Sequence, residues 1–351
     1  MSEHTVLSVD YHDQTSVIRD YASGTGAERV QSVPTDPTAL RRVVEQAAAG
    51  GRAVIWIQES TPGWARVKEL LGPHVHDFLL ANVLQLPRRP KEGGKKTDRL
   101  DTQRVLHEYL LGRLVTAWQP EPAWRQARRV VAWREDLVSR RTALRNWLNR
   151  YLAHETWIDR TGLWSVQGQA RWRELLPRLP ASDQVVIAGK RAELEHLAGQ
   201  LEQAQQQLLE LYRRWPAAQR LDAIKGISVI AAVSILARIG PIERFPNAEA
   251  LIAYAGLAPG VRQSDQTRHD GHLGGGGTDG SLRHYLVEAS VWARHVPRYC
   301  PAYERVARRR GPRVGRLHVC RMMLRSIDKL LRHGVAFDPA PPVSRPAPAR
   351  G

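Results

Sequence analysis

The sequence has 351 residues, 42% of them hydrophobic and 25% charged, which excludes a disordered or fibrous chain and leaves room for about two or three domains. Its formal net charge of +17 indicates a polyanionic partner such as nucleic acid, although an arginine-rich proteome would give the same excess. Cys300 and Cys320 show neither metal-ligand spacing nor a disulfide framework. Because we find no signal peptide and no apolar run that could span a bilayer, we expect a cytoplasmic protein without a membrane partner.

Strand-like and helix-like stretches alternate in the first part of the chain. Helices are predicted at residues 37–51, 63–72 and 95–114. Strands are predicted at residues 5–11, 15–21, 29–35, 52–60 and 77–86, the first two as a hairpin. Strands followed by strand–helix alternation predict an α/β domain with a mixed sheet over residues 1–120.

The pattern becomes helical from residue 121 onward. One helix is expected over residues 133–155, with an apolar stripe at Trp133, Leu137, Leu144, Leu148 and Tyr151. A second is expected over residues 185–215, with a seam at Ile187, Leu194, Leu197, Leu201, Ala204, Leu208 and Leu211. This spacing predicts a helical coiled-coil region over residues 121–215. It fits two helices of one chain and contacts between copies in a dimer or tetramer equally well.

A third, mainly helical region is predicted over residues 216–338. Two helices joined by a Gly-containing turn are expected over residues 221–240, and Asn247 has the position of a helix N-cap. Further helices are expected at residues 282–295 and 315–334. Residues 339–351 are rich in Pro, Ala and Arg, which predicts a disordered tail.

Four carboxylates of the first domain are candidate metal ligands. Asp10 and Glu59 end predicted strands, while Asp98 and Asp101 are three residues apart and therefore share one face of a helix. If such acids converge, their mutual repulsion favours a divalent cation, and oxygen ligands suit Mg²⁺. Bound ions of this kind activate a nucleophile and stabilise a leaving oxygen at a phosphate. Each acid taken alone could equally be a solvated surface residue.

Basic residues of the third region are candidate contacts to a nucleic-acid backbone. The stretch KGIS, which begins at Lys225, resembles the turn of a helix–hairpin–helix, although an ordinary helix hairpin is an equal reading. From Glu304 through Arg332 the chain has ten Lys or Arg residues and two acids. Such an unbalanced run indicates a phosphate-binding face. Its candidates are Arg308, Arg309, Arg310, Arg313 and Arg316.

The segment VRQSDQTRHDGHLGGGG, residues 261–277, has a composition that predicts neither helix nor strand. Ser264 lies between Arg262 and Arg268, and four glycines follow at residues 274–277. Without a following Lys-Ser/Thr these glycines are no P-loop, and they predict a flexible hinge. A loop serine is on composition alone more often inert than reactive, and no Gly-x-Ser-x-Gly elbow surrounds this one. Ser281 is expected to be an N-cap, and Ser290 to lie within the next helix.

The chain resembles the DEDD-type insertion-sequence transposases of the IS110 (IS116/IS902-like) group, which are bridge-RNA-guided recombinases. The resemblance extends from about Val6 to Phe337. In the first domain it rests on SVDYH, WIQESTPGW and KKTDRLDTQRV. In the third region it rests on IKGISVIAAVSILARIGPIERFPNAEALIAYAGLAP, the serine segment and GSLRHYLVEAS.

This resemblance implies a RuvC-like, ribonuclease-H-type first domain, a coiled-coil insert and a C-terminal transposase domain. It assigns the metal-binding quartet to Asp10, Glu59, Asp98 and Asp101, and the nucleophile to Ser264. The implied partners are donor DNA, target DNA and a structured guide RNA. Two departures stand out, Gly260 where the family has a basic residue and GGGGTDGS after the serine. A metal-dependent nuclease without a covalent intermediate and an inactive nucleic-acid-binding remnant are the alternatives.

Overall fold

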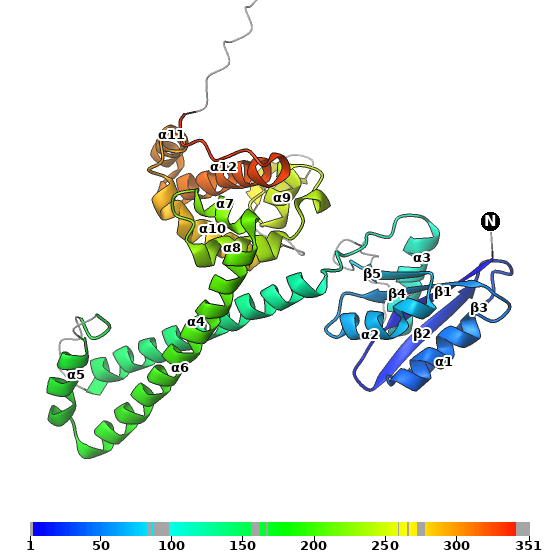
Figure 1. The fold of residues 1–351 in the computed structure, drawn as a ribbon, viewed down its shortest axis with the longest axis horizontal. Coiled ribbons are helices and arrows are strands. Elements are labelled where there is room, and N and C mark those ends of the chain that lie inside the picture. The colour runs from blue at the N-terminus through cyan, green and yellow to red at the C-terminus, as the bar shows by residue number, and fades with distance from the viewer. Residues whose placement is uncertain are drawn as a thin grey trace, which may run out of the picture. The chain divides into compact units, whose positions relative to one another are not determined.

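The computed structural model describes residues 3–82, 86, 98–155, 162–165, 168–258, 260–264, 267–271 and 278–341. The side chains of residues 98–100, 155, 169, 260–264 and 267–271 are outside that description. The chain divides into two compact units, Met1–Gln119 and Pro120–Gly351 (Figure 1). In the described part of the chain, no helix combines the length and the apolar character that a membrane crossing requires.

The first unit contains a five-stranded mixed sheet with the strand order β3-β2-β1-β4-β5. β1 pairs antiparallel with β2 and parallel with β4, while β2–β3 is antiparallel and β4–β5 is parallel. The predicted α/β domain with a mixed sheet is therefore confirmed. The strands are β1 His4–Asp10, β2 Thr15–Ala22, β3 Glu28–Pro34, β4 Ala53–Glu59 and β5 Asp77–Ala81.

Helices cover both faces of this sheet. α1 Pro37–Ala47 and α2 Trp64–Leu71 pack on one face, against a cluster that includes Leu7, Val9 and Trp56. α3 Asp98–Leu110 packs on the other face, where Val105 and Leu106 meet side chains of β1 and β4. Because successive strand residues point to opposite faces, the odd positions of β1 face α1 and α2, and its even positions face α3.

The second unit begins with a long helical arm (Figure 1). Its helices are α4 Pro122–Glu155, α5 Gly168–Leu175 and α6 Ala181–Arg214. The apolar seam of α6 packs along α4 of the same chain, where Leu137 joins Leu197, Leu201 and Ala204 in one cluster. This intramolecular pairing is one of the two arrangements that the heptad spacing allowed, and contact between copies stays a prediction.

One residue of the predicted α4 stripe is not part of the buried surface. Trp133 is 36% exposed, whereas Leu137 and Leu148 are buried. The buried side of α4 instead continues from Val131 past Arg134, whose Nε is buried. The apolar spacing alone could not distinguish Trp133 from its polar neighbour, so the prediction for Trp133 was wrong.

The rest of the second unit is a helical body around one large core cluster. The long helix α12 Pro312–His333 supplies Val319, Met323 and Leu324 to that core. The other α-helices of the body are α7 Pro216–Asp222, α8 Val229–Ile239, α9 Ala248–Tyr254, α10 Gly280–Ala293 and α11 Cys300–Arg310. Asn247 caps α9, since its side chain accepts from the Ala250 N–H, as the sequence predicted.

The base of the arm is hydrogen-bonded to this body. Arg128 of α4 donates to the carbonyls of Ala237 and Arg238 at the C-terminal end of α8, at 2.8 and 2.7 Å. Glu135, about two turns further along α4, forms an ion pair with Arg238 at 3.1 Å. These bonds satisfy carbonyls that a helix end leaves open, so they fix α4 to α8.

The turn between α7 and α8 depends on a glycine. Gly226 has a φ of +98°, and a Cβ at this position would lie 2.3 Å from the carbonyl oxygen of Ala289 in α10. Ser228 then caps α8 by accepting from the Ala231 N–H. The predicted helix–turn–helix over residues 221–240 is confirmed, and only glycine fits its turn.

Replacing Gly226 with Ala is therefore expected to lower the free energy of unfolding by about 1–3 kcal/mol, because the strained φ adds to the collision with Ala289. Gly189 is the matched control, since it lies within α6 and a Cβ there would meet nothing within 4 Å. Gly189→Ala should stabilise the protein by up to about 1 kcal/mol. Urea unfolding followed by circular dichroism measures both, and equal midpoints for the two variants would contradict the assignment.

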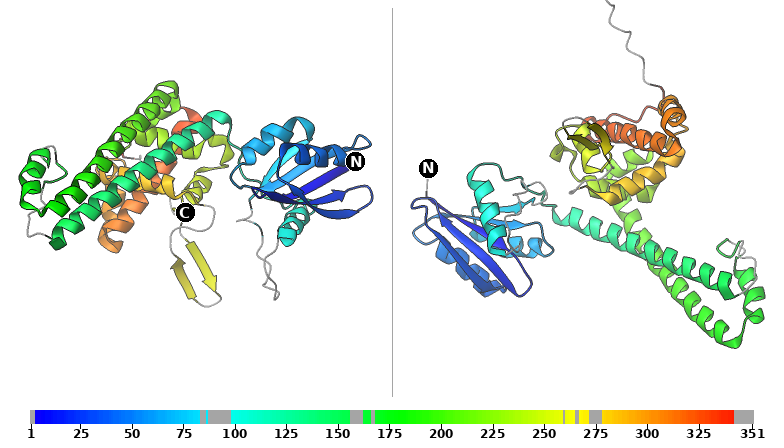
Figure 2. Two further views of the ribbon diagram at one scale, coloured as in Figure 1. Left: turned by 90° about the horizontal axis from the view of Figure 1, so that it is seen from below. Right: turned by 180° about the vertical axis from the view of Figure 1, so that it is seen from behind.

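The prediction that the serine segment forms neither helix nor strand was wrong, because the segment contains two short strands. β6 Gly260–Ser264 and β7 Thr267–Gly271 pair antiparallel as a two-stranded sheet (Figure 2). The two strands pair their backbone hydrogen-bonding groups with each other and have no apolar face, so hydrophobic patterning does not predict them. The predicted hinge at residues 274–277 lies outside the described residues. So does most of the predicted tail, although Pro339 accepts a hydrogen bond from the Arg298 N–H at 2.9 Å.

Candidate active site

Asp10 and Glu59 lie at the ends of neighbouring parallel strands. The register pairs Val9 of β1 with Gln58 of β4, so Asp10 and Glu59 follow at the same level. Parallel neighbours at one level point to the same face, and here it is the face that α3 covers. Asp10 is 8% exposed and Glu59 is half-buried. Two carboxylates therefore come to one edge of the sheet, as the strand-end pattern predicted.

α3 is tied to this edge by a buried hydrogen bond. The Ser8 hydroxyl, two residues before Asp10 on the same face, donates to the carbonyl of Thr102 at 2.8 Å. Both partners are buried, at 0% and 1% exposure. Asp101 immediately precedes Thr102 and Asp98 begins the helix, so the acid-bearing turn of α3 starts at the edge where β1 ends. The side chain of Asp98 is among those that the structure leaves undescribed.

Asp10 has a neighbour that sequence reasoning missed. His12 Nε2 lies 3.4 Å from Asp10 Oδ2, and the imidazole is about half exposed. The SVDYH motif contains this histidine, but the sequence does not predict where a side chain two residues beyond a strand end will point. Among the described side chains, no three His, Cys, Asp or Glu come close enough together to hold a metal ion. The described side chains include those of Asp10, Glu59 and Asp101 but not that of Asp98.

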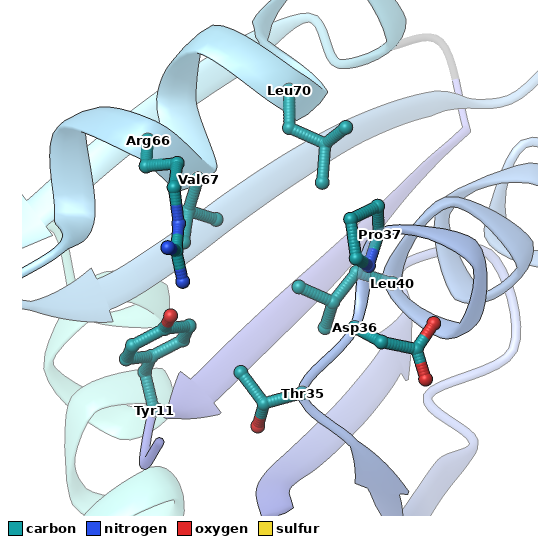
Figure 3. Close-up of a pocket in the computed structure, with 8 residues that line it drawn as sticks. All are labelled: Tyr11, Thr35, Asp36, Pro37, Leu40, Arg66, Val67 and Leu70. Atoms are coloured by element: carbon teal, nitrogen blue, oxygen red, sulfur yellow. The ribbon is translucent and has the colours of Figure 1, made fainter. Parts of the chain in front are cut away.

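Tyr11, the residue after Asp10, faces the opposite side of the sheet. It lines a pocket of about 260 Å³ between the start of α1 and α2. Figure 3 shows its hydroxyl directed toward Arg66 of α2, with Leu40 and Val67 forming apolar walls. Strand alternation thus separates this small pocket from the carboxylates, and the four acids have no part in it.

Ser264 is the last residue of β6. In the hairpin register it pairs with Thr267, while Arg262 pairs with His269 and Gln263 with Arg268. The backbone thus brings two arginines and one histidine to the same short ribbon as the serine. These are positions along the strands, because the side chains of β6 and β7 are outside the described part of the chain.

The two ends of the serine segment are held together. The Asp279 N–H donates to the carbonyl of Tyr254 at 2.8 Å, and the Tyr254 hydroxyl lies 3.2 Å from Asp279 Oδ2. Gly256 has a φ of +66°, and a Cβ there would lie 3.1 Å from Thr278 Cβ. Arg321 of α12 donates through Nε to the carbonyl of Leu257 at 2.7 Å. The segment therefore leaves and re-enters the body at one fixed point, which we call the clasp.

The serines after this segment have structural partners. Asp279 rather than Ser281 is the N-cap of α10, because its side chain accepts from the Leu282 N–H. Ser281 instead donates to the Glu135 carboxylate of α4. The prediction that Ser281 caps α10 was wrong. The Ser281 side chain bonds to a distant helix, so Asp279 caps α10 instead. Ser290 lies inside α10, as predicted, and donates to the carbonyl of Val287 at 2.6 Å.

The predicted basic face lies where α11 meets α12. Arg308, Arg309 and Arg310 form the exposed last turn of α11, and Arg313 is exposed in the first turn of α12. Arg316 is half-buried, and Arg308 forms a surface ion pair with Glu304 at 3.6 Å. One acid among so many cations leaves the patch strongly positive, as a phosphate-binding surface requires.

This positive charge continues along α12 to the clasp. Burial, followed by the nearby Arg325 and Arg310, lowers the pKa of Arg321. Burial, followed by Arg321, Arg325 and Arg305, lowers the pKa of His318. Crowded cations repel one another, and a phosphate beside them would relieve that repulsion. Lys225 is also exposed, in the turn before α8, but far along the chain from this patch.

Two families match parts of the chain. Residues 9–155, which contain all four acids, match the DEDD transposases of IS110 type, and residues 218–304, which contain Ser264, match the Transposase IS116/IS110/IS902 family. The chain belongs to this transposase family. The predicted resemblance is confirmed at the level of the family.

Individual relatives are distant. The provisionally named transposase y4qE of Sinorhizobium fredii is 24% identical over 273 residues, which cover 76% of this chain and 65% of the relative. An uncharacterized 43.6 kDa protein of insertion element IS110 from Streptomyces coelicolor is 25% identical over 155 residues, which cover 44% of this chain and 38% of the relative. The match thus spans less than two thirds of either relative's length.

Proposed function

We propose that this transposase cleaves and rejoins donor and target DNA, guided by a structured RNA, with a metal-binding acid quartet and a serine nucleophile. The observation that carries the proposal is the placement of Asp10 and Glu59 at the same end of the sheet. The Ser8–Thr102 hydrogen bond holds the acid-bearing turn of α3 over that end. The RuvC-like assignment of the first unit rests on the same arrangement of mixed sheet and α3.

The donor set suits a hard divalent cation such as Mg²⁺. Asp10 and Glu59 bring carboxylate oxygens to one face, and Asp101 and Asp98 begin the helix that covers it. A bound ion there would stabilise negative charge on phosphate oxygens during phosphoryl transfer. The four carboxylates would hold that ion, and His12 lies beside Asp10 at the rim of the proposed site.

Ser264 supplies the nucleophilic oxygen. Its Oγ forms a bond to a DNA phosphorus while the bond from that phosphorus to a deoxyribose oxygen breaks. The serine proton passes to a base, and the released deoxyribose oxygen takes up a proton. Attack by a hydroxyl of another strand then reverses the exchange, joins the new strands and frees the serine. Arg262, two residues before Ser264 on the same strand, would balance charge on the non-bridging oxygens, whereas Arg268 pairs with Gln263 at the alternate position.

The experiment that tests this function is strand exchange in a purified system. The full chain is incubated with Mg²⁺, donor and target DNA, and RNA transcribed from the sequence that flanks its gene. We expect joined DNA only when the RNA and the ion are both present. Cleavage without joining would favour a metal-dependent nuclease, and binding without cleavage would favour an inactive remnant. The protein is expected to act as a dimer or tetramer, which light scattering of the complex measures.

The basic face should determine how binding depends on salt. On duplex DNA, log K is expected to fall with log salt by about 0.9 per phosphate neutralised. Replacing Arg308, Arg309 and Arg310 together with Gln should flatten that slope by up to about 3, measured by fluorescence anisotropy between low and moderate salt. The matched control removes the exposed Arg213, Arg214 and Arg220, which lie outside the face. An equal loss of slope in both triple variants would show that only total charge matters.

A further inference from the structure

The arm carries a cleft that the proposed reaction does not use. It lies between α4, the turn at residues 162–165, α5 and α6, and has a volume of about 200 Å³. The indoles of Trp164 and Trp172 and the guanidinium groups of Arg145 and Arg191 line it. We call it the indole cleft. Aromatic rings and arginines around one opening are the side chains that bind unstacked bases.

The walls of the indole cleft are fixed before any ligand arrives. Trp164 donates from Nε1 to Asn149 Oδ1 of α4 at 3.0 Å, and Trp172 is 3% exposed in the core of the arm. The two rings meet edge to face, with centroids 5.7 Å apart. Gly168 allows the turn to pack on α5, because a Cβ there would lie 2.1 Å from the carbonyl of Leu163. A rigid site of this kind loses little entropy on binding.

Each indole already has a cation over it. Arg145 lies 5.1 Å from the Trp164 ring centroid, and Arg191 lies 5.2 Å from that of Trp172. The Arg145–Trp164 pair places a flat guanidinium group next to a partly exposed ring, so a base can stack there, whereas the buried Trp172 forms the floor of the cleft. Glu195 also lines the cleft, and its carboxylate can accept from an exocyclic amino group of a base.

A row of arginines on α4 leads to the indole cleft. Arg141 and Arg145 are four residues apart, which places them on one helix face, whereas Arg134 lies at the base of the arm beside Tyr285. Each has a buried Nε for which the described residues provide no hydrogen-bond acceptor. Burial, then Arg145 and Arg134, lowers the pKa of Arg141, so these cations also repel one another. Phosphate oxygens would supply the missing acceptors and the opposite charge.

We propose that the indole cleft binds one unpaired nucleotide of a single-stranded nucleic acid, with its base against Trp164 and its backbone along Arg141 and Arg145. An apolar peptide would leave the buried Nε groups without acceptors, which is unfavourable. The chemistry is shared by RNA and DNA, so the probe must distinguish them. The site goes beyond the proposed recombination and does not depend on the identity of a guide.

The test uses the full chain and dye-labelled oligonucleotides of equal length, one of ribouridine, one of thymidine and one duplex. Arg145→Gln and Trp164→Ala are each expected to weaken single-strand binding about 5- to 150-fold and to change duplex binding much less. A photoreactive 4-thiouridine probe should crosslink to the peptide that contains Trp164 or Trp172. Loss confined to the ribose or to the deoxyribose probe identifies the natural strand.

Arg140→Gln is the matched control, since Arg140 is exposed on another face of α4 and already pairs with Asp136 at 2.9 Å. Arg145→Gln leaves both indoles in place, so it remains decisive if Trp164→Ala destabilises the arm. The proposal would be overturned if Arg145→Gln and Trp164→Ala bound every probe as tightly as Arg140→Gln does and no crosslink formed between residues 162 and 198. So would an altered oligomeric state with unchanged nucleotide binding, because the cleft would then be a protein contact.

Discussion

Replacing Ser264 with Ala is expected to abolish the covalent protein–DNA adduct and all strand joining while RNA and DNA binding stay intact. In the proposed mechanism the serine supplies only the attacking oxygen, whereas the acids would hold the metal ion and the arginines would bind the phosphate backbone. Each protein is incubated with guide RNA, Mg²⁺ and target DNA, and the adduct is detected as a species that survives denaturation.

The body of the second unit provides two control serines. Ser290→Ala removes a hydroxyl that bonds within α10, and Ser281→Ala removes the contact with Glu135. Both variants should still form the adduct, with about 0.5–2 kcal/mol of stability lost at most. A normal adduct yield from Ser264→Ala would mean that another group is the nucleophile. Complete loss in the control variants as well would point to folding rather than chemistry.

The second large effect is expected at the carboxylates. Single changes of Asp10, Asp98 or Asp101 to Asn, or of Glu59 to Gln, should lower Mg²⁺-dependent cleavage by roughly 100-fold or more, because each removes a negatively charged ligand. Nucleic-acid binding should change little, since cations rather than acids contact the backbone. Cleavage rates over a range of Mg²⁺ concentration measure the loss.

Asp77 offers a matched acid at the other edge of the same sheet. It begins β5 and is exposed, whereas Asp10 and Glu59 end their strands. Asp77→Asn should therefore cleave at the normal rate. If all four quartet variants cleave as Asp77→Asn does, the metal site lies elsewhere. A cleavage defect that high Mg²⁺ restores would, in contrast, indicate weakened ion binding.

Much of the first unit was predictable because its strands carry strong local signals. The run of apolar residues before Glu59 and the alternating residues before Asp10 identify β4 and β1 without tertiary information. The position of α3 over the ends of these strands could not be predicted from the sequence, because it depends on the Ser8–Thr102 hydrogen bond between residues far apart in the chain. The sequence therefore offered the acids as candidates but not the contact that places α3 over the strand ends.

The second unit shows where local rules fail. At the start of α10, Asp279 and Ser281 are equally good capping residues, and Glu135 from a distant helix engages Ser281. On α4 the choice between Trp133 and Arg134 for the inner side depends on packing against the body. The β6–β7 ribbon has no apolar alternation at all. The indole cleft joins residues from four separate segments, which no single motif describes.

The clasp at Tyr254, Gly256 and Asp279 has a consequence for how this family can vary. Since both ends of the serine segment are fixed to the body, its closure is already determined by residues outside it. Each doubling of the length of such a segment raises the free energy of closing the loop by only about 0.6 kcal/mol. Insertions, deletions and the substitution of a glycine run can thus accumulate there without unfolding the core. The proposed nucleophile thus lies on a segment that tolerates replacement, and grafting a segment from a relative between Gly256 and Thr278 is a practical route to altered recombinases.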